Sequence, residues 1–340
     1  MKRLVAMVLL SFTLGFVGLY LVSREALLDP ASYLPVDLGT SPVALGLLSF
    51  GLMWIIPYRR LQLLAQQHHY RLSPYTAWLA HIAMVFGAAL TPGGSGGAPT
   101  LVAALTRLGV PWGTGIGMAV QIFILDLVVF AWLIPLGLFY AIFSETLVLP
   151  GKLELLSLIA ALVALAGALM LGRYPRPVVR LMLSLARQRS LRRWATRLRQ
   201  AARSYYRSAR AFAAMRLREW VWLQLVTLLG WLANFTLFWA LLTIYGSQVR
   251  LLDIIVLLSV ITLVSFVVPT PGAAGFMEFV VGLAAGGHLA QPIAAPILFW
   301  RLGGFYLTFV LGPLAGWLLL LHKPPHWLQR WWQRRRRAGD

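Results

Sequence analysis

The sequence predicts an all-α polytopic membrane protein with about six full spans and two re-entrant helical hairpins arranged as inverted repeats. Three observations predict this fold: the composition, the clustering of cations, and two Gly/Pro breaks inside apolar segments. Hydrophobic residues make up 59% of the 340-residue chain and charged residues 12%. Soluble domains have about half apolar and about a quarter charged residues. The composition therefore excludes a soluble globule and a disordered chain.

Six apolar stretches are long enough to cross the hydrocarbon core, which takes about 20 helical residues. They lie at about 4–22, 40–57, 112–143, 153–172, 220–245 and 290–321. The first stretch follows Met1-Lys2-Arg3, as in a signal peptide. No small-residue cleavage site follows it, so we expect it to be retained as a span.

The cations indicate the orientation of these spans. Lys and Arg number 30 against 10 Asp and Glu, a net charge of +20. Most of the cations lie at the N-terminus and in 57–75, 173–218 and 323–340. The positive-inside rule places these segments, and with them both termini, in the cytoplasm. The domain prediction is a single transmembrane domain over 1–322, with a basic cytoplasmic tail over 323–340.

The Arg-rich segment 173–218 interleaves arginine with apolar residues. This pattern is typical of an amphipathic helix lying on a membrane surface, so we expect it on the inner leaflet, near anionic phospholipid. Charge alone also suits nucleic acid, but in so apolar a chain we expect no nucleic-acid partner.

Two further apolar segments, 76–111 and 251–289, are each interrupted midway. The breaks are Thr91–Pro99 and Pro269–Gly275. The charge pattern requires each segment to return to the face it left, and the apolar run 76–90 reaches only roughly 22 Å of the ~30 Å core. For either break alone, a plain turn or a helix kink is an equal alternative. Together the two breaks favour re-entrant hairpins in opposite orientations, a pattern that indicates a transporter-type site near the midplane.

The residues at the two breaks also carry a family resemblance. It rests on Thr91-Pro92-Gly93-Gly94-Ser95-Gly96-Gly97 with Gly109-Val110-Pro111, and on Pro269-Thr270-Pro271-Gly272-Ala273-Ala274-Gly275 with Glu278 and Arg301. These motifs resemble the lysylphosphatidylglycerol synthase transmembrane-region family, also described as flippase-like. The resemblance implies an inner-membrane protein with two re-entrant hairpins, a region thought to move a modified phospholipid between leaflets. The chain stops at Asp340 without a soluble aminoacyl-transferase domain, so we do not expect synthase activity. Ala98 stands where relatives often carry a polar or acidic residue.

Ionisable residues inside the spans are candidates for function by default. Glu278 and Arg301 are the first pair: they either engage a lipid headgroup or form a structural ion pair. Asp126 is either a proton or headgroup acceptor or the cap of a half-helix. His81 we expect to be a core histidine.

The two Gly-rich turns are candidates through their backbone. Glycine lets backbone N–H groups approach a phosphate closely, and it also permits a tight reversal. The candidates are Pro92, Gly93, Gly94, Ser95, Gly96 and Gly97 in the first turn, and Pro271, Gly272 and Gly275 in the second.

These observations predict a lipid translocase, flippase- or scramblase-like, with membrane phospholipids, most often anionic, as partners. One alternative is an intramembrane enzyme acting on a lipid-linked phosphate, and the other is a scaffold without transport. We see no catalytic constellation and expect no enzyme activity, no cofactor and no metal. A protein partner, if there is one, is a second copy of the chain or a separate lipid-modifying enzyme.

Overall fold

The computed structural model describes residues 2–28, 33–35, 38–143, 158–159, 161–163, 165–168, 170, 174–188, 194–286 and 293–322. These ranges are helical and contain no β-strand, which confirms the all-α class. The helices are α1 (Lys2–Leu28), α2 (Thr40–Gln67), α3 (Pro74–Ala89), α4 (Gly97–Arg107), α5 (Trp112–Phe143), α7 (Arg176–Arg187), α8 (Ala195–Ala213), α9 (Leu217–Ile244), α10 (Leu251–Ser265), α11 (Phe276–Gly286), α12 (Ala294–Arg301), the π-helical turn η3 (Leu302–Tyr306) and α13 (Thr308–Leu321).

Among the described residues, 5 helical segments are long and apolar enough to cross a membrane. They are Val5–Val22, Thr40–Gln67, Trp112–Tyr140, Leu217–Ile244 and Ala294–Leu321. Each overlaps a predicted span. The predicted span 153–172 falls largely outside the described residues, and so does the basic tail 323–340.

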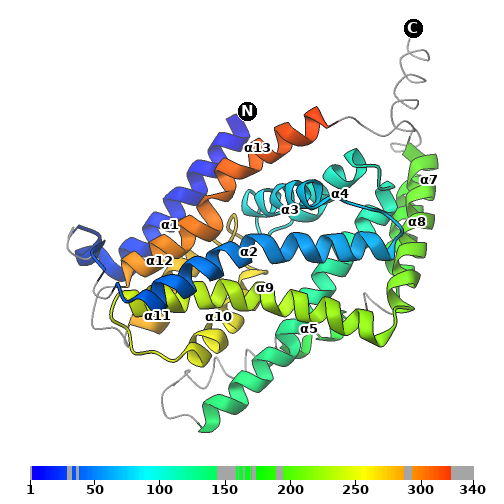
Figure 1. Cartoon of the computed structure of the whole chain (residues 1–340). Helices are drawn as coiled ribbons and strands as arrows, with labels where there is room; N and C mark the ends of the chain where they lie inside the picture. Colours follow the sequence, from blue (N-terminus) through cyan, green and yellow to red (C-terminus); the bar gives the residue numbers. More distant parts are fainter. Residues whose placement is uncertain are drawn as a thin grey trace.

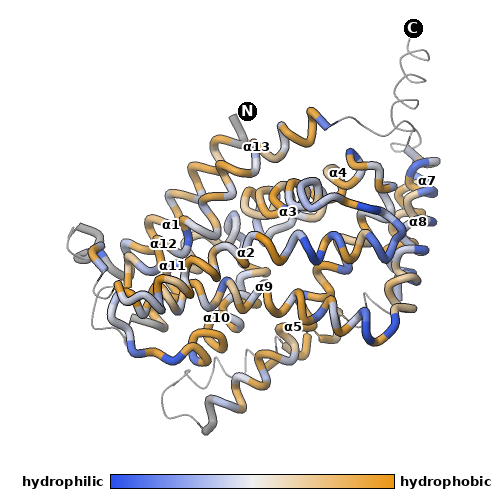
Figure 2. The backbone as a smooth tube through the Cα atoms, in the orientation of Figure 1, coloured by the Kyte–Doolittle hydropathy of each residue, from blue (hydrophilic) through white to orange (hydrophobic). Residues whose placement is uncertain are grey.

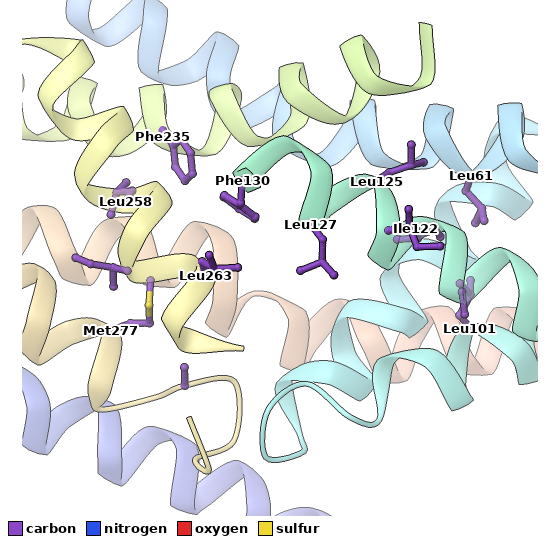
Figure 3. Packing of buried hydrophobic residues seen from close by; sticks show 14 of the residues in the cluster. Leu61, Leu101, Ile122, Leu125, Leu127, Phe130, Phe235, Leu258, Leu263 and Met277 are labelled. Carbon is purple, nitrogen blue, oxygen red and sulfur yellow. The ribbon is translucent and has the colours of Figure 1, made fainter. Parts of the chain in front are cut away.

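The spans form a bundle in which α2 and α9 run side by side through the middle (Figure 1). Its apolar core includes Phe130 of α5, Phe235 of α9 and Leu258 of α10, all with 0% exposure. Figure 3 shows these side chains in the space between the three helices. Lipid-facing surfaces of the bundle are apolar too, as expected when the surrounding solvent is hydrocarbon.

Helix α2 extends further than predicted. We expected the span to end at Pro57 and a basic loop to follow from 57 to 75, but the helix runs through Pro57 to Gln67. The expectation was wrong because Arg59 and Arg60 were both counted as cytoplasmic cations. Arg60 is instead buried, with 7% exposure, and its charge is balanced by a partner inside the bundle.

The two Gly/Pro breaks are turns between pairs of short helices. The first joins α3, which Ser73 caps by accepting a 3.2 Å hydrogen bond from the Thr76 N–H, to α4. The second joins α10 to α11. The two turns meet: Pro92 and Pro271 lie opposite each other in antiparallel orientation, and the Gly93 N–H donates to the Val268 carbonyl at 3.2 Å. Figure 3 shows the two hairpins, cyan and yellow, running away from this contact to opposite sides.

The Arg-rich segment forms a pair of helices, α7 and α8, across one end of the bundle (Figure 1). Hydrophilic residues gather on these helices and on the adjoining ends of α2 and α9 (Figure 2). Helix α8 packs against α5, where Tyr205 is only 1% exposed. Gly113 of α5 permits this approach, because a Cβ there would overlap the Ala201 carbonyl of α8.

Candidate functional site

A cavity of about 550 Å³ lies inside the bundle. Its wall comes from α2, α3, α5 and α9, from the first Gly-rich turn and the start of α4, and from one residue each at the end of α10 and in η3. Most of the wall is apolar. The polar and charged residues in it are Arg60, His81, Ser95, Asp126, Thr227 and Asn234.

Arg60 of α2 and Asp126 of α5 form an ion pair in the cavity wall. The Arg60 Nη1 donates to the Asp126 Oδ1 at 2.5 Å, and the two side chains are 9% and 13% exposed. The Trp231 Nε1 of α9 donates to the same oxygen at 3.0 Å. A buried charge is tolerated when it is paired and hydrogen-bonded. This pair therefore places two opposite charges stably in an apolar bundle.

The pair leaves hydrogen-bonding capacity unused. The Arg60 Nε is buried and has no partner among the described residues, and the same is true of the Nε1 of Trp54, another residue of the cavity wall. The Asp126 Oδ2 accepts no hydrogen bond from the described part of the chain, since both of its partners use Oδ1. A buried donor left without a partner costs about 1–3 kcal/mol, so the cavity wall contains donors that the described residues leave unsatisfied.

The backbone of the first Gly-rich turn is largely occupied by its own reversal. The N–H groups of Gly94, Ser95 and Gly97 donate to carbonyls within the turn at 3.0–3.3 Å. The Gly96 N–H donates to the Thr91 Oγ1 at 2.6 Å. The turn needs glycine at two positions, because Gly93 has a φ of 58° and Gly94 a φ of 67°. Of the two readings of this turn, the hydrogen bonds favour the tight reversal.

A second cluster surrounds Glu278 in α11, which is fully buried at 0% exposure. The Arg301 Nε donates to the Glu278 Oε1 at 2.7 Å, and the Tyr306 hydroxyl donates to the same oxygen at 3.4 Å. The Gly275 N–H donates to the Glu278 Oε2 at 2.8 Å, so the carboxylate also caps the start of α11. The guanidinium lies over the Phe305 ring, 4.0 Å from its centroid. Both charges are satisfied within the protein, and neither residue lines the cavity.

The π-helical turn η3 directly follows Arg301. An inserted residue of this kind shifts the helix face, and such turns are frequent at functional sites. Here the turn holds Phe305 and Tyr306, whose rings lie 4.0 and 5.9 Å from the Arg301 guanidinium carbon. The second cluster thus couples α11 to the last span through one carboxylate.

The family model for the lysylphosphatidylglycerol synthase TM region matches residues 2–312. The chain belongs to this family. The match is to the membrane region of the family. A search of curated proteins finds no match to the chain. With its long apolar helices, this member of the lysylphosphatidylglycerol synthase TM-region family is a multi-pass membrane protein.

In this family member the predicted site residues fall into two groups joined by the contact between the turns. Asp126, Gly93, Gly94, Ser95 and Gly97 line the cavity, as does His81. Glu278, Arg301, Gly272 and Gly275 belong to the second cluster, where the Arg301 Nη2 lies 3.5 Å from the Gly272 carbonyl. Pro92 and Pro271 form the contact, and Gly96 is held by Thr91.

Sequence reasoning missed Arg60, Trp231 and Tyr306. Arg60 was assigned to a loop, although Leu61, Leu64 and Ala65 continue a buried apolar stripe beyond Pro57. That stripe was the available signal for Arg60. For Trp231 and Tyr306, two aromatic residues in apolar spans, the sequence carried no signal.

A polar junction holds the Arg-rich helices to the bundle. The His68 Nε2 lies 2.9 Å from the Gln121 Oε1 and 3.1 Å from the Ser208 Oγ of α8. The Gln121 Nε2 donates to the Ser208 carbonyl at 3.2 Å. Burial lowers the pKa of His68 below its ordinary value, although the hydrogen bond with Gln121 partly opposes this shift.

Proposed function

We propose that this protein is a lipid translocase that moves the headgroup of a membrane phospholipid between leaflets, without chemistry on the lipid. One observation carries the proposal: an ion pair with unused hydrogen-bonding atoms lies in a cavity of about 550 Å³ inside an apolar bundle. Intramembrane charges are expensive and mark substrate paths. Family membership agrees with a lipid-related role.

In this proposal the two short helix pairs are re-entrant hairpins that enter from opposite faces as inverted repeats. Helices α3 and α10 have 16 and 15 residues and α4 and α11 have 11 each. At about 1.5 Å per residue, the longest reaches about 24 Å, short of the ~30 Å core. The contact between their turns at Pro92 and Pro271 supports entry from opposite sides.

The turn contact lies beside the cavity, because Gly93 takes part in both. A headgroup in the cavity therefore adjoins the place where the two hairpins meet. Separation of the turns opens a polar route past this point, and their contact closes it. Irregular backbone at membrane depth is tolerated when it lines such a cavity.

The proposed location is the bacterial inner membrane, with both termini in the cytoplasm. The end of the bundle that carries α7 and α8 is then the cytoplasmic end, which agrees with the positive-inside rule. The proposed partners are membrane phospholipids. Exposed arginines of these helices, such as Arg180, Arg203 and Arg210, attract anionic headgroups at this surface.

The test is leaflet exchange in vesicles that contain the purified protein and a trace of headgroup- or chain-labelled phospholipid. The informative variant is Gly230→Leu, since Gly230 lines the cavity and a Cβ there meets only the tips of Ile56 and Pro57 at 3.5 and 3.9 Å. The matched control is Gly51→Leu, because a Cβ at Gly51 meets nothing within 4 Å.

We expect the wild-type protein and Gly51→Leu to accelerate exchange over protein-free vesicles, and Gly230→Leu to slow it several-fold. Exchange no faster than in empty vesicles for every headgroup tried would refute the proposal. Equal exchange rates for Gly230→Leu and wild type would show that the lipid headgroup does not pass through the cavity.

A further inference from the structure

We propose that the cavity selects a phospholipid headgroup that carries one phosphate and one primary ammonium, with no net charge. This inference deepens the proposed function, because it names the class of lipid that the same cavity takes. It rests on the charge balance of the cavity, on the free edges of its ion pair, and on the apolar rest of its wall.

The charge balance comes first. Arg60 and Asp126 are the cavity-lining residues of opposite charge, and each neutralises the other. A headgroup with a net negative charge adds an uncompensated anion to a desolvated site, and a net positive headgroup adds an uncompensated cation. Either is unfavourable, because a charge without a partner in such a site keeps its desolvation penalty. A headgroup with both charges adds none.

The free edges of the ion pair give this dipolar headgroup a definite orientation. Only Nη1 of the Arg60 guanidinium is used by Asp126, and its Nε has no partner in the described part of the chain. The Nη2 group is therefore the donor left for a phosphate, and the fixed charge of the guanidinium strengthens that hydrogen bond. The Asp126 Oδ2 is the carboxylate oxygen left to accept from an ammonium, since both partners of Asp126 use Oδ1.

The headgroup then lies alongside the ion pair, with its phosphate beside Arg60 and its ammonium beside Asp126, because phosphate and ammonium are separated by only two carbons. The ion pair in the wall stays intact, and each of its members gains a second, opposite partner. The Ala98 N–H at the start of α4 has no partner among the described residues and lies in the same wall, where it adds a donor for the phosphate.

The rest of the wall favours a lipid over a free phosphate ester. Side chains of Met53, Val85, Ile122, Phe123 and Phe266 line the cavity around the ion pair. They suit the glycerol backbone and the first methylenes of the acyl chains, because burial of apolar surface stabilises the complex. A free phosphate ester of ethanolamine has no group to fill this region.

The experiment measures ligand-induced thermal stabilisation of the purified full-length protein in detergent. The ligands are dihexanoyl phosphatidylethanolamine, its N-acetylated form, dihexanoyl phosphatidylglycerol, and O-phosphoethanolamine. We expect phosphatidylethanolamine to half-saturate the shift at a concentration at least ten-fold lower than each of the other three.

Two variants should change this pattern in different ways. In Asp126→Asn the ammonium loses its partner and Arg60 stays charged, so phosphatidylglycerol should bind at least as well as phosphatidylethanolamine. In Arg60→Gln the phosphate loses its partner, and binding of both lipids should weaken at least ten-fold. The control Arg216→Gln removes a cation from an ion pair whose arginine side chain is 85% exposed, and it should leave all four ligands unchanged.

Each outcome decides something. Equal half-saturation by phosphatidylethanolamine and its N-acetylated form would overturn the inference, and this comparison needs only wild-type protein should a variant fail to fold. Equal binding of O-phosphoethanolamine would overturn the assignment to a lipid. Selective binding without leaflet exchange would refute the translocase proposal and leave this inference standing. Leaflet exchange without headgroup selectivity in either assay would overturn this inference and leave the translocase proposal standing.

Discussion

The buried Glu278–Arg301 pair should be structural: removing one partner should destabilise the fold, and neither partner should take a direct part in transport. The perturbation is Glu278→Gln, which removes the charge and keeps an oxygen that accepts from the Gly275 N–H. Glu278 is 0% and Arg301 8% exposed at the side chain, so the variant leaves a guanidinium uncompensated in a dry environment.

The expected loss follows from that burial. Breaking a buried ion pair by removing one partner costs about 3–5 kcal/mol of unfolding free energy. Glu278→Met should cost about 0.5–1.5 kcal/mol more, because the Gly275 N–H also loses its acceptor. The double variant Glu278→Met/Arg301→Met removes both charges, and replacement of such pairs by apolar residues is neutral or stabilising by about 1–4 kcal/mol.

The assay is unfolding of the purified protein in mixed micelles with increasing dodecyl sulfate, followed by circular dichroism. Glu219→Gln is the matched control, because Glu219 forms a comparable pair with Arg216 whose arginine side chain is 85% exposed. We expect little change for the control, since exposed pairs stabilise proteins weakly.

Leaflet exchange completes the test. The double variant should fold and should exchange lipid like wild type, because neither Glu278 nor Arg301 lines the cavity. A loss below about 1 kcal/mol for Glu278→Gln would refute the energetic reasoning, since that is the range of an exposed pair. A stable double variant without exchange would assign the pair to the transport route instead.

Three further perturbations test other parts of the structure. Gly93→Ala should destabilise the protein by about 1–2 kcal/mol, because Gly93 has a φ of 58° and a Cβ there lies 3.0 Å from the Phe266 carbonyl; dodecyl sulfate unfolding measures this, and a loss no larger than for Gly51→Ala would contradict it. The lowered pKa of His68 means that the unfolded chain binds the proton more readily, so its contribution is complete above about pH 6.5 and is lost as the pH falls. The midpoint of thermal unfolding should therefore fall further between pH 8 and pH 5 for wild type than for His68→Gln, and equal falls would count against this reading. Gly113→Leu should displace α8 from α5, since even a Cβ overlaps the α8 backbone; limited proteolysis should then cut the Arg-rich helices faster than in the wild type, and an unchanged pattern would show that the helices do not depend on this contact.

The sequence predicted the parts of the fold that depend on local pattern. The length of the apolar stretches identified the spans. The Pro-Gly runs at 92–97 and 269–275 identified two turns, because proline and glycine interrupt helices. The contact between the turns was not predictable in the same way. It joins Pro92 to Pro271, and a single sequence carries no signal for a pairing over that distance.

The sequence predicted only part of the candidate site, because the partner of Asp126 comes from a distant segment. Asp126 stood out because an acid in an apolar span is rare, but its partner did not. Arg60 follows Arg59 directly and comes soon after a proline, so both arginines fitted the cytoplasmic end of a span. Only the fold distinguishes them, since Arg60 alone of the two is buried against α5.

The prolines at the centre of the molecule limit how firmly the two hairpins can join. Neither Pro92 nor Pro271 has an N–H to donate, so this meeting of extended backbones cannot grow into a ladder. The amide bond from Gly93 to Val268 is worth about 0.5–1.5 kcal/mol net. The contact between the two turns therefore contributes little to holding the hairpins together, and the helices that flank the turns supply most of the packing.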